Sequence, residues 1–328
     1  MKTALLLGAG FSKNWGGWLA KEVFEYLLGC KEIQGDRQLL NMLWQFQNDG
    51  FESVLAALRK ESEFFPDDKV KSQLQAFQGA VSGMFDEMND GFSHITDWDY
   101  NLNLTKHFFT RFDQIFSLNQ DLLLEQHYMN DNVMLLSQGF SSWGGAYLPG
   151  MKPITLYERN LSKTFLYPDQ KENFVLEEKL QPIIKLHGSS NWASQQGDHL
   201  LILGGDKESQ LSKFDILNWY FDLFKKSLNS ITKLMIIGYG FQDPHINTAL
   251  HNAVKDNNLK IFVISPDGPE QALLMNKSKR SNQIPHDTPL EEMFRSSLIG
   301  ASRAPLRETF KNLNSAEFNK VCKFFQPG

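Results

Sequence analysis

Cysteine is nearly absent from this 328-residue sequence, which contains only Cys30 and Cys322. No C-x-x-C pair occurs, so the sequence excludes a zinc ribbon held by cysteines and offers no disulfide framework. A chain without disulfides fits a reducing compartment, and we therefore expect a cytoplasmic protein. We expect no metal site in it and, in particular, no zinc.

Long apolar runs and an excess of one charge are lacking as well. No stretch approaches the roughly 20 apolar residues of a membrane-spanning helix, and the start MKTALLLGAG lacks the basic segment of a signal peptide. The net charge is −5, and no basic cluster is longer than KSKR at 277–280. We therefore expect neither membrane association nor direct nucleic-acid binding.

What the sequence does contain is an alternation of short apolar runs and helical periodicity. The run TALLLG stops at a glycine and is followed by apolar residues at helical spacing, which predicts a strand, a turn and a helix. Residues 36–110 show long helical patterns with few strand signals. Further strands are predicted at 112–118, 132–137, 181–188, 199–205, 233–240 and 259–266, with helices at 212–229 and 243–254.

Several of these runs are continuously apolar, as central parallel strands buried on both faces are. The sequence therefore predicts an α/β fold, with a doubly wound, mainly parallel Rossmann-like sheet and a helical insertion subdomain. We expect the sheet domain to comprise 1–30 and 111–266, and the insertion to comprise 31–110. Residues 267–328 are predicted to form a C-terminal extension, which is a candidate for assembly or a partner contact.

The candidate site residues lie in small and polar turns after five of the predicted strands. Ligands of open α/β sheets bind beyond the carboxyl ends of the strands, and glycine turns let backbone N–H groups approach phosphate. These turns contain Gly8, Ala9, Gly10, Phe11 and Ser12, then Asn119 and Asp121, then His187, then Gly238, Tyr239 and Gly240, and finally Ser265.

Each of these residues also has a purely structural interpretation. Gly-x-Gly after a strand is often only a tight turn, and a lone histidine such as His187 is usually structural. Asn119 fits a helix N-cap, and Asp121 fits the first turn of the same helix. Asp243 and His245 are interpreted as N-cap and turn residues at a helix start rather than as catalytic groups.

Taken together and in order, the motifs GAGFS, SLNQD, KLHGSSNW and GYGFQDPHIN resemble the sirtuin-like domains of bacterial anti-phage defence proteins. The resemblance covers roughly residues 1–266 and implies that NAD+ is bound as a substrate. It implies that the residues from Gly8 to Ser12 wrap the pyrophosphate and that Asn119 and Asp121 lie beside the nicotinamide ribose. It further implies a catalytic role for His187, ribose and phosphate contacts for Gly238, Tyr239 and Gly240, and a place near the adenosine for Ser265.

Three features depart from the sirtuin deacylase pattern. The four zinc-binding cysteines of the deacylases are missing, and Gly240 stands where a serine is usual. The deacylase sequence G-I-P-D-F-R is also missing, since the chain reads Gly16-Gly17-Trp18-Leu19. Without the zinc module we expect no docking of an acylated peptide, which leaves water as the acceptor.

The resemblance and its departures imply an NAD+ hydrolase that releases nicotinamide and ADP-ribose as the NAD-depleting effector of a defence system. In this interpretation Asn119 orients the water, and His187, whose ordinary pKa lies near neutrality, transfers a proton. A dehydrogenase is disfavoured independently. Lys13 replaces the third glycine of its fingerprint, and no second strand with an acidic end follows.

An NAD+ hydrolase that is always active would deplete the NAD+ of its own cell, so its activity must be inhibited until it is needed. We expect a homo-oligomer and a separately encoded partner, such as a ring-forming DNA-translocating ATPase or an Argonaute. Two other functions stay open at this point: a non-catalytic sensor of NAD+ or ADP-ribose, and a residual deacylase or ADP-ribosyltransferase. Retention of both Asn119 and His187 favours the hydrolase over the sensor, because a sensor needs neither water orientation nor a base.

Overall fold

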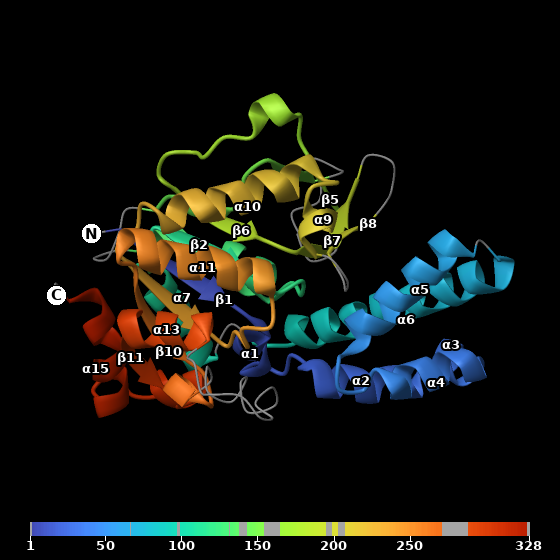
Figure 1. Ribbon diagram of the computed structural model, residues 1–328. Helices are drawn as coiled ribbons and strands as arrows, with labels where there is room; N and C mark the ends of the chain where they lie inside the picture. The colour runs from blue at the N-terminus through green and yellow to red at the C-terminus, as the bar shows by residue number, and fades with distance from the viewer. Residues whose placement is uncertain are drawn as a thin grey trace.

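A seven-stranded, all-parallel sheet forms the centre of the computed structural model (Figure 1). The structure describes residues 2–65, 67–96, 99–130, 132–137, 143–153, 165–194, 199–202, 207–270 and 288–326. In spatial order the strands are β11 (Leu298–Ser302), β10 (Lys260–Ile264), β9 (Lys233–Ile237), β1 (Thr3–Leu7), β2 (Gln114–Ser117), β6 (Leu180–Lys185) and β3 (Gly145–Tyr147). The predicted doubly wound α/β fold is confirmed.

Both faces of the sheet are covered, which explains why its central strands are mostly apolar. On one face Phe116 of β2 contacts Phe224 of α10 (Asp215–Leu228), with ring centroids 5.0 Å apart. On the other face Phe262 of β10 packs against Phe324 in the short helix η4 (Lys323–Phe325). A strand buried on both sides has no solvent face for polar residues, so the alternating pattern is lost.

The winding of the sheet reverses between β1 and β9. Strands β2, β6 and β3 lie on one side of β1, and β9, β10 and β11 lie on the other. Leu7 at the end of β1 pairs with Ser117 on one side and Ile237 on the other, so the three strands end level. The turns that follow them therefore start at one edge, at the switch point where open α/β sheets bind ligands.

Six helices separate α1 (Ala9–Lys13) from β2, and most of them form an arm that projects from the sheet (Figure 1). At the starts of three of these helices, α4, α6 and α7, an aspartate side chain accepts a backbone N–H as an N-cap does. The six helices are α2 (Ala20–Gly29), α3 (Lys31–Gln34), α4 (Arg37–Gln45), α5 (Phe51–Phe64), α6 (Asp68–Ser93) and α7 (Tyr100–Phe109). The division of the chain into domains stays a prediction.

A second, four-stranded sheet and a set of short helices complete the described chain. The small sheet contains, in order, β4 (Met151–Pro153), β5 (Leu166–Pro168), β7 (Gly188–Ala193) and β8 (His199–Leu201). The remaining helices are η1 (Glu125–Met129), α8 (Val133–Leu136), η2 (Lys171–Asn173), α9 (Lys207–Leu211), α11 (Pro244–Asn257), η3 (Gly268–Glu270), α13 (Pro289–Ser297), α14 (Leu306–Thr309) and α15 (Ala316–Cys322). Among the described helices, none has both the length and the apolar character needed to span a bilayer.

Five of the predicted strands are found in the main sheet and both late helices are confirmed, whereas the strand predicted at 132–137 is wrong. Residues 132–137 contain helix α8, because the Asn132 side chain accepts the Leu135 N–H and starts a helical turn. Within 199–205, β8 runs antiparallel to β7 in the small sheet instead of joining the main one. Residues 203–206 lie outside the described part of the chain. Strand β11, which lies in the predicted C-terminal extension, was not foreseen and forms an edge of the main sheet.

Gly188, which starts β7, is required by the close approach of β8. Its φ is +77°, and a Cβ there would lie 1.9 Å from the Leu200 carbonyl oxygen. We expect Gly188→Ala to lower the free energy of unfolding by about 3 kcal/mol or more, measured by urea denaturation. Gly79→Ala in α6 is the matched control, since a Cβ at that position meets nothing within 4 Å.

The control substitution removes a helix-interior glycine and is expected to raise the free energy of unfolding by about 0.5–1 kcal/mol. Equal stability of the two variants would contradict the packing described for the β7–β8 contact.

Candidate active site

All five predicted turns line one cavity of about 840 Å³ at the switch point of the sheet. The structure thereby brings together residues separated by more than half of the chain. The predicted site residues in its wall are Gly8, Ala9, Gly10, Asn119, Asp121, His187, Gly238, Tyr239, Gly240 and Ser265. Phe11 and Ser12 are buried next to this wall, and the Phe11 ring packs against Trp15 and Phe109.

Two other parts of the chain and Lys207 of α9 line the cavity and were not predicted to contribute. The helical arm lines it with the residues from Asp49 to Glu52 and with Met84, Phe85 and Met88. The segment after β11 lines it with the residues from Arg303 to Arg307. No local sequence signal marks these residues, because they reach the cavity only through the packing of the arm and of β11 against the sheet.

The glycines of the first turn allow it to touch the turn after β9. The N–H of Gly8 donates to the Ile237 carbonyl and that of Gly10 to the Gly238 carbonyl, both at 2.9 Å. A Cβ on Gly8 or Gly10 would lie 2.7 Å from backbone atoms of residues 238–239. Two of the N–H groups predicted to face phosphate are therefore used between the turns. Contact with a pyrophosphate stays a prediction for this loop.

Ser12 connects the first turn to the second through a buried hydrogen-bond network. Its hydroxyl donates to Asp121 Oδ2 at 2.7 Å and accepts from the Asn119 amide Nδ2 at 2.9 Å. Asp121 also accepts the Leu123 N–H at 3.1 Å. Burial raises the pKa of the Asp121 carboxyl, while the nearby Lys185 charge and the Ser12 hydrogen bond act to lower it. Asn119 does not cap a helix as the sequence suggested. The helical residues before η1 begin at Leu123, and it is Asp121 that accepts the N–H there.

The buried ion pair between Lys185 and Glu125 fixes the position of the Asp121 backbone. Lys185 Nζ donates to Glu125 Oε1 at 2.5 Å, to the Asp121 carbonyl at 2.6 Å and to Ser189 Oγ at 2.7 Å. Both charged side chains are at most 1% exposed. Removing either partner alone would leave an uncompensated buried charge, so this pair fixes the second turn relative to β6 and β7.

Gln120 ties the second turn to the His187 turn. Its Nε2 donates to the Ile202 carbonyl at 2.7 Å and to the His187 carbonyl at 3.3 Å. Its own carbonyl accepts the Ser190 N–H at 2.8 Å. The two turns that carry the predicted catalytic residues are therefore fixed to each other by hydrogen bonds.

His187 is surrounded by polar groups that the sequence did not connect with it. His187 Nε2 lies 3.1 Å from His245 Nε2. The nearby Asp243 carboxylate forms a 2.7 Å ion pair with Lys207, which also pairs with Glu52 of the helical arm at 2.9 Å. Burial acts to lower the pKa of Lys207, but Glu52 and Asp243 outweigh it and the net shift is upward.

The pKa of His187 is lowered to about 3, first by burial and then by the Lys207 charge. The expectation of a histidine that titrates near neutrality is therefore wrong for this protein, and the His187 imidazole is neutral at physiological pH. Burial alone would raise the pKa of the Asp243 carboxyl, but His187 and Lys207 lower it below its ordinary value. A neutral imidazole thus lies beside an ionised Asp243–Lys207 pair.

Asp243 occupies the N-cap position of α11, as predicted, but its side chain accepts no backbone N–H of that helix. The Tyr239 hydroxyl accepts the Asp243 N–H instead, at 3.1 Å. The Asp243 carboxylate is therefore left to face Lys207 and the His187 side of the cavity. At the neighbouring turn Ser265 Oγ accepts the Gly268 N–H at 3.0 Å and closes the loop after β10.

The segment Asn14–Trp18, where the deacylase residues are missing, is braced by the C-terminal part of the chain. Asn14 Nδ2 donates to the Gly10 carbonyl at 2.8 Å, and its Oδ1 accepts the Leu306 N–H at 2.9 Å. Arg307 Nε donates to the Asn14 carbonyl at 2.7 Å. The first turn is therefore held in place from outside the sheet as well as from within it.

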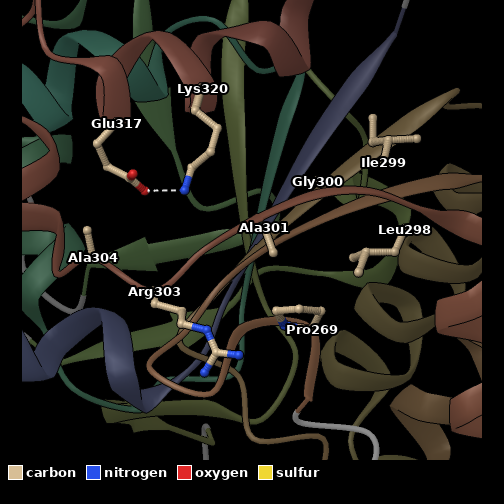
Figure 2. Close-up of a pocket in the computed structure, with 9 residues that line it drawn as sticks. All are labelled: Pro269, Leu298, Ile299, Gly300, Ala301, Arg303, Ala304, Glu317 and Lys320. Carbon is tan, nitrogen blue, oxygen red and sulfur yellow. Dashed lines mark ion pairs between the residues drawn. The ribbon is translucent and has the colours of Figure 1, made fainter.

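A second cavity, of about 540 Å³, lies along β11 and the segments that follow it (Figure 2). The charged groups around it are paired with one another or with neighbours. Glu317 binds Lys320 at 2.7 Å, and Arg303 binds Glu270 at 3.1 Å. Arg303 and Ala304 line both cavities, but none of the five predicted turns contributes to the wall of this second one.

The burial of a neutral His187 predicts how the free energy of unfolding depends on pH. A histidine with an unfolded pKa near 6.5 and a folded pKa of about 3 stabilises the fold above pH 6.5, and this stabilisation is lost as the pH falls toward 3. Between about pH 7.5 and 5 we expect the free energy of unfolding to fall by roughly 2 kcal/mol from this group. In His187→Gln that part of the loss should vanish.

Chemical denaturation at both pH values measures the loss. The control is His94→Gln, at a side chain that is 78% exposed, and it should keep the wild-type pH dependence. An unchanged pH dependence in His187→Gln would contradict the burial described above.

Comparison with known proteins gives a similar solved structure and a matching family. A mutant of a Sir2 homologue in complex with ADP-ribose is a similar solved structure, with 11% sequence identity and a TM-score of 0.40. The match covers 99% of this chain and 95% of that one. No curated protein matches the sequence. A SIR2-like domain family matches residues 113–284, which is just over half of the chain. The protein therefore belongs to the SIR2-like domain family.

Proposed function

We propose that this protein hydrolyses NAD+ at the nicotinamide–ribose bond and releases nicotinamide and ADP-ribose. The observation that carries the proposal is the common wall formed by Asn119 and His187 in one cavity, beside the two glycine-containing turns after β1 and β9. Membership of the SIR2-like family supports NAD+ as the ligand. In this proposal the turn after β1 and the turns after β9 and β10 hold the dinucleotide, as the resemblance to sirtuins implies.

The network around Ser12 supports the role of Asn119. A hydroxyl has one hydrogen, and Ser12 gives it to Asp121, so Ser12 can only accept from Asn119. The Asn119 amide group must therefore present its NH2 to Ser12. This leaves the Oδ1 acceptor for a ligand in the cavity. An amide oxygen fixed in this way can accept a hydrogen from water or from a ribose hydroxyl and orient its lone pair.

His187 supplies the proton acceptor in this mechanism. Its Nε2 faces His245, so Nδ1 is the nitrogen left to act on water or on a ribose hydroxyl. The low pKa keeps the imidazole unprotonated across the physiological range. Because the buried site disfavours imidazolium, the proton that leaves the attacking water is passed on rather than retained. The products are nicotinamide, ADP-ribose and one proton.

Water is the proposed acceptor because this chain's own arm occupies part of the cavity wall around the five turns. Met84, Phe85 and Met88 of α6 line the cavity there, and Asp49 to Glu52 join them. In deacylases the corresponding acceptor is an acylated peptide held between the sheet domain and the zinc module. The two cysteines of this chain, Cys30 and Cys322, cannot form a four-cysteine zinc site.

We further propose that the hydrolase is the NAD-depleting effector of an anti-phage defence system. The support is the sequence resemblance to defence-associated sirtuin-like domains. Restraint in uninfected cells would come from self-assembly and from a separately encoded partner, such as a ring-forming DNA-translocating ATPase or an Argonaute. Native mass spectrometry that finds a monomer with full activity in isolation would contradict this regulation, but not the hydrolase itself.

The reaction is tested by following nicotinamide release from NAD+ by chromatography, with and without candidate partners. We expect release without any acylated peptide, and we expect Asn119→Ala and His187→Ala each to lower kcat by about 100-fold or more. Gln242→Ala is the matched control, since Gln242 lines the same cavity from the turn after β9 but has no role in the proposed chemistry.

The other two functions give different results in the same assay. Tight NAD+ binding without turnover under every condition would support a sensor and overturn the hydrolase. Release that requires an acylated peptide would support a deacylase.

A further inference from the structure

A group of metal-binding side chains lies at the edge of the candidate active site. One ring nitrogen of His187, one of His245 and a carboxylate oxygen of Asp243 all lie within 4.8 Å of one another. The two imidazole nitrogens are 3.1 Å apart. Both histidines are less than 9% exposed, and His187 and Asp243 line the cavity. Sequence reasoning assigned Asp243 and His245 to the start of α11 and expected no metal site.

The spacing suits a four-coordinate transition-metal ion. Zinc binds imidazole nitrogens at about 2.0–2.1 Å, so two nitrogens of a tetrahedral site lie about 3.3 Å apart. The observed 3.1 Å between His187 and His245 is close to that separation. The Asp243 oxygen lies within 4.8 Å of the ring nitrogens, so a shift of up to about 1.5 Å brings it to the third ligand position. The cavity offers the fourth position to water.

The charges around the three ligands favour a cation. Asp243 and Glu52 are acidic, and Lys207 is the basic group that pairs with both. Two carboxylates against one ammonium leave one negative charge. Lys207 occupies Oδ1 of Asp243, but it retains Glu52 as a partner if a metal ion takes the carboxylate.

We propose that His187, His245 and Asp243 form a binding site for a divalent transition-metal ion such as zinc, with its open coordination position facing the cavity. Imidazole and carboxylate ligands suit zinc and cobalt rather than magnesium or calcium, which prefer oxygen ligands alone. The site differs in place and in ligands from a four-cysteine zinc site, for which this chain lacks the residues.

The site would act as an off-switch for the reaction, and this consequence rests on the proposed hydrolysis of NAD+. A neutral imidazole carries one hydrogen. When Nε2 of His187 binds a metal ion, that hydrogen must be on Nδ1, which is the nitrogen that the reaction needs as an acceptor. Bound metal therefore removes the base without displacing the dinucleotide turns. Micromolar metal would inhibit nicotinamide release, and a chelator would restore it.

Titration of the full-length, metal-free protein with Co2+ tests the site without any assay of activity. We expect one equivalent to bind with the visible absorption bands of four-coordinate Co2+, and Zn2+ to displace it. His245→Ala and Asp243→Asn should each weaken Co2+ binding by more than about 100-fold, since they remove a direct ligand. Lys207→Met should strengthen binding, because the competing ammonium is gone.

The control is His251→Ala, at a histidine two turns further along α11, and it should leave the Co2+ spectrum unchanged. Circular dichroism and thermal melting establish that each variant is folded, and His245→Gln replaces His245→Ala if the latter is not. Co2+ binding that is absent, or that is unaffected by both ligand variants, would overturn the proposal. Because the spectrum is independent of turnover, a failure of the hydrolase would be seen separately as the absence of nicotinamide release from the metal-free protein.

Discussion

The hydroxyl of Ser12 is the point on which the candidate active site depends. It joins the turn after β1 to the turn after β2, donating to Asp121 and accepting from Asn119. Because one hydrogen cannot be donated twice, this arrangement fixes which end of the Asn119 amide faces the cavity. The surrounding structure keeps Asp121 in place: Lys185 binds its carbonyl, and Gln120 connects the turn to the loop of His187.

The second constraint is the backbone contact between Gly10 and Gly238, which brings two strand ends together at the switch point of the sheet. It leaves a cavity whose opposite wall is built by the arm and by the segment after β11. Two linked ion pairs in the cavity wall connect Glu52 on the arm through Lys207 to Asp243 near His187. The electrostatics of His187 therefore depend on where the helical arm lies.

Much of the fold follows from the sequence, because strands buried on both faces leave a continuous apolar signal, as in β1, β9 and β10. The turns after them were found for the same reason. The helix α8 was mistaken for a strand, since a four-residue apolar run cannot distinguish the two. Strand β11 contains Gly300 at an edge of the sheet and has no such signal. The group around His187 was missed because Glu52, Lys207 and Asp243 meet only through tertiary packing. The lowered pKa of His187 arises from that burial and cannot be read from composition.

The central claim is that Ser12 prepares Asn119 for catalysis by holding its amide in one orientation. The most direct measurement is kcat for nicotinamide release by Ser12→Ala, under the condition in which the wild type turns over, together with the affinity for NAD+. We predict that kcat falls to the level of Asn119→Ala while the affinity changes by less than about tenfold. Wild-type kcat in Ser12→Ala would contradict the account.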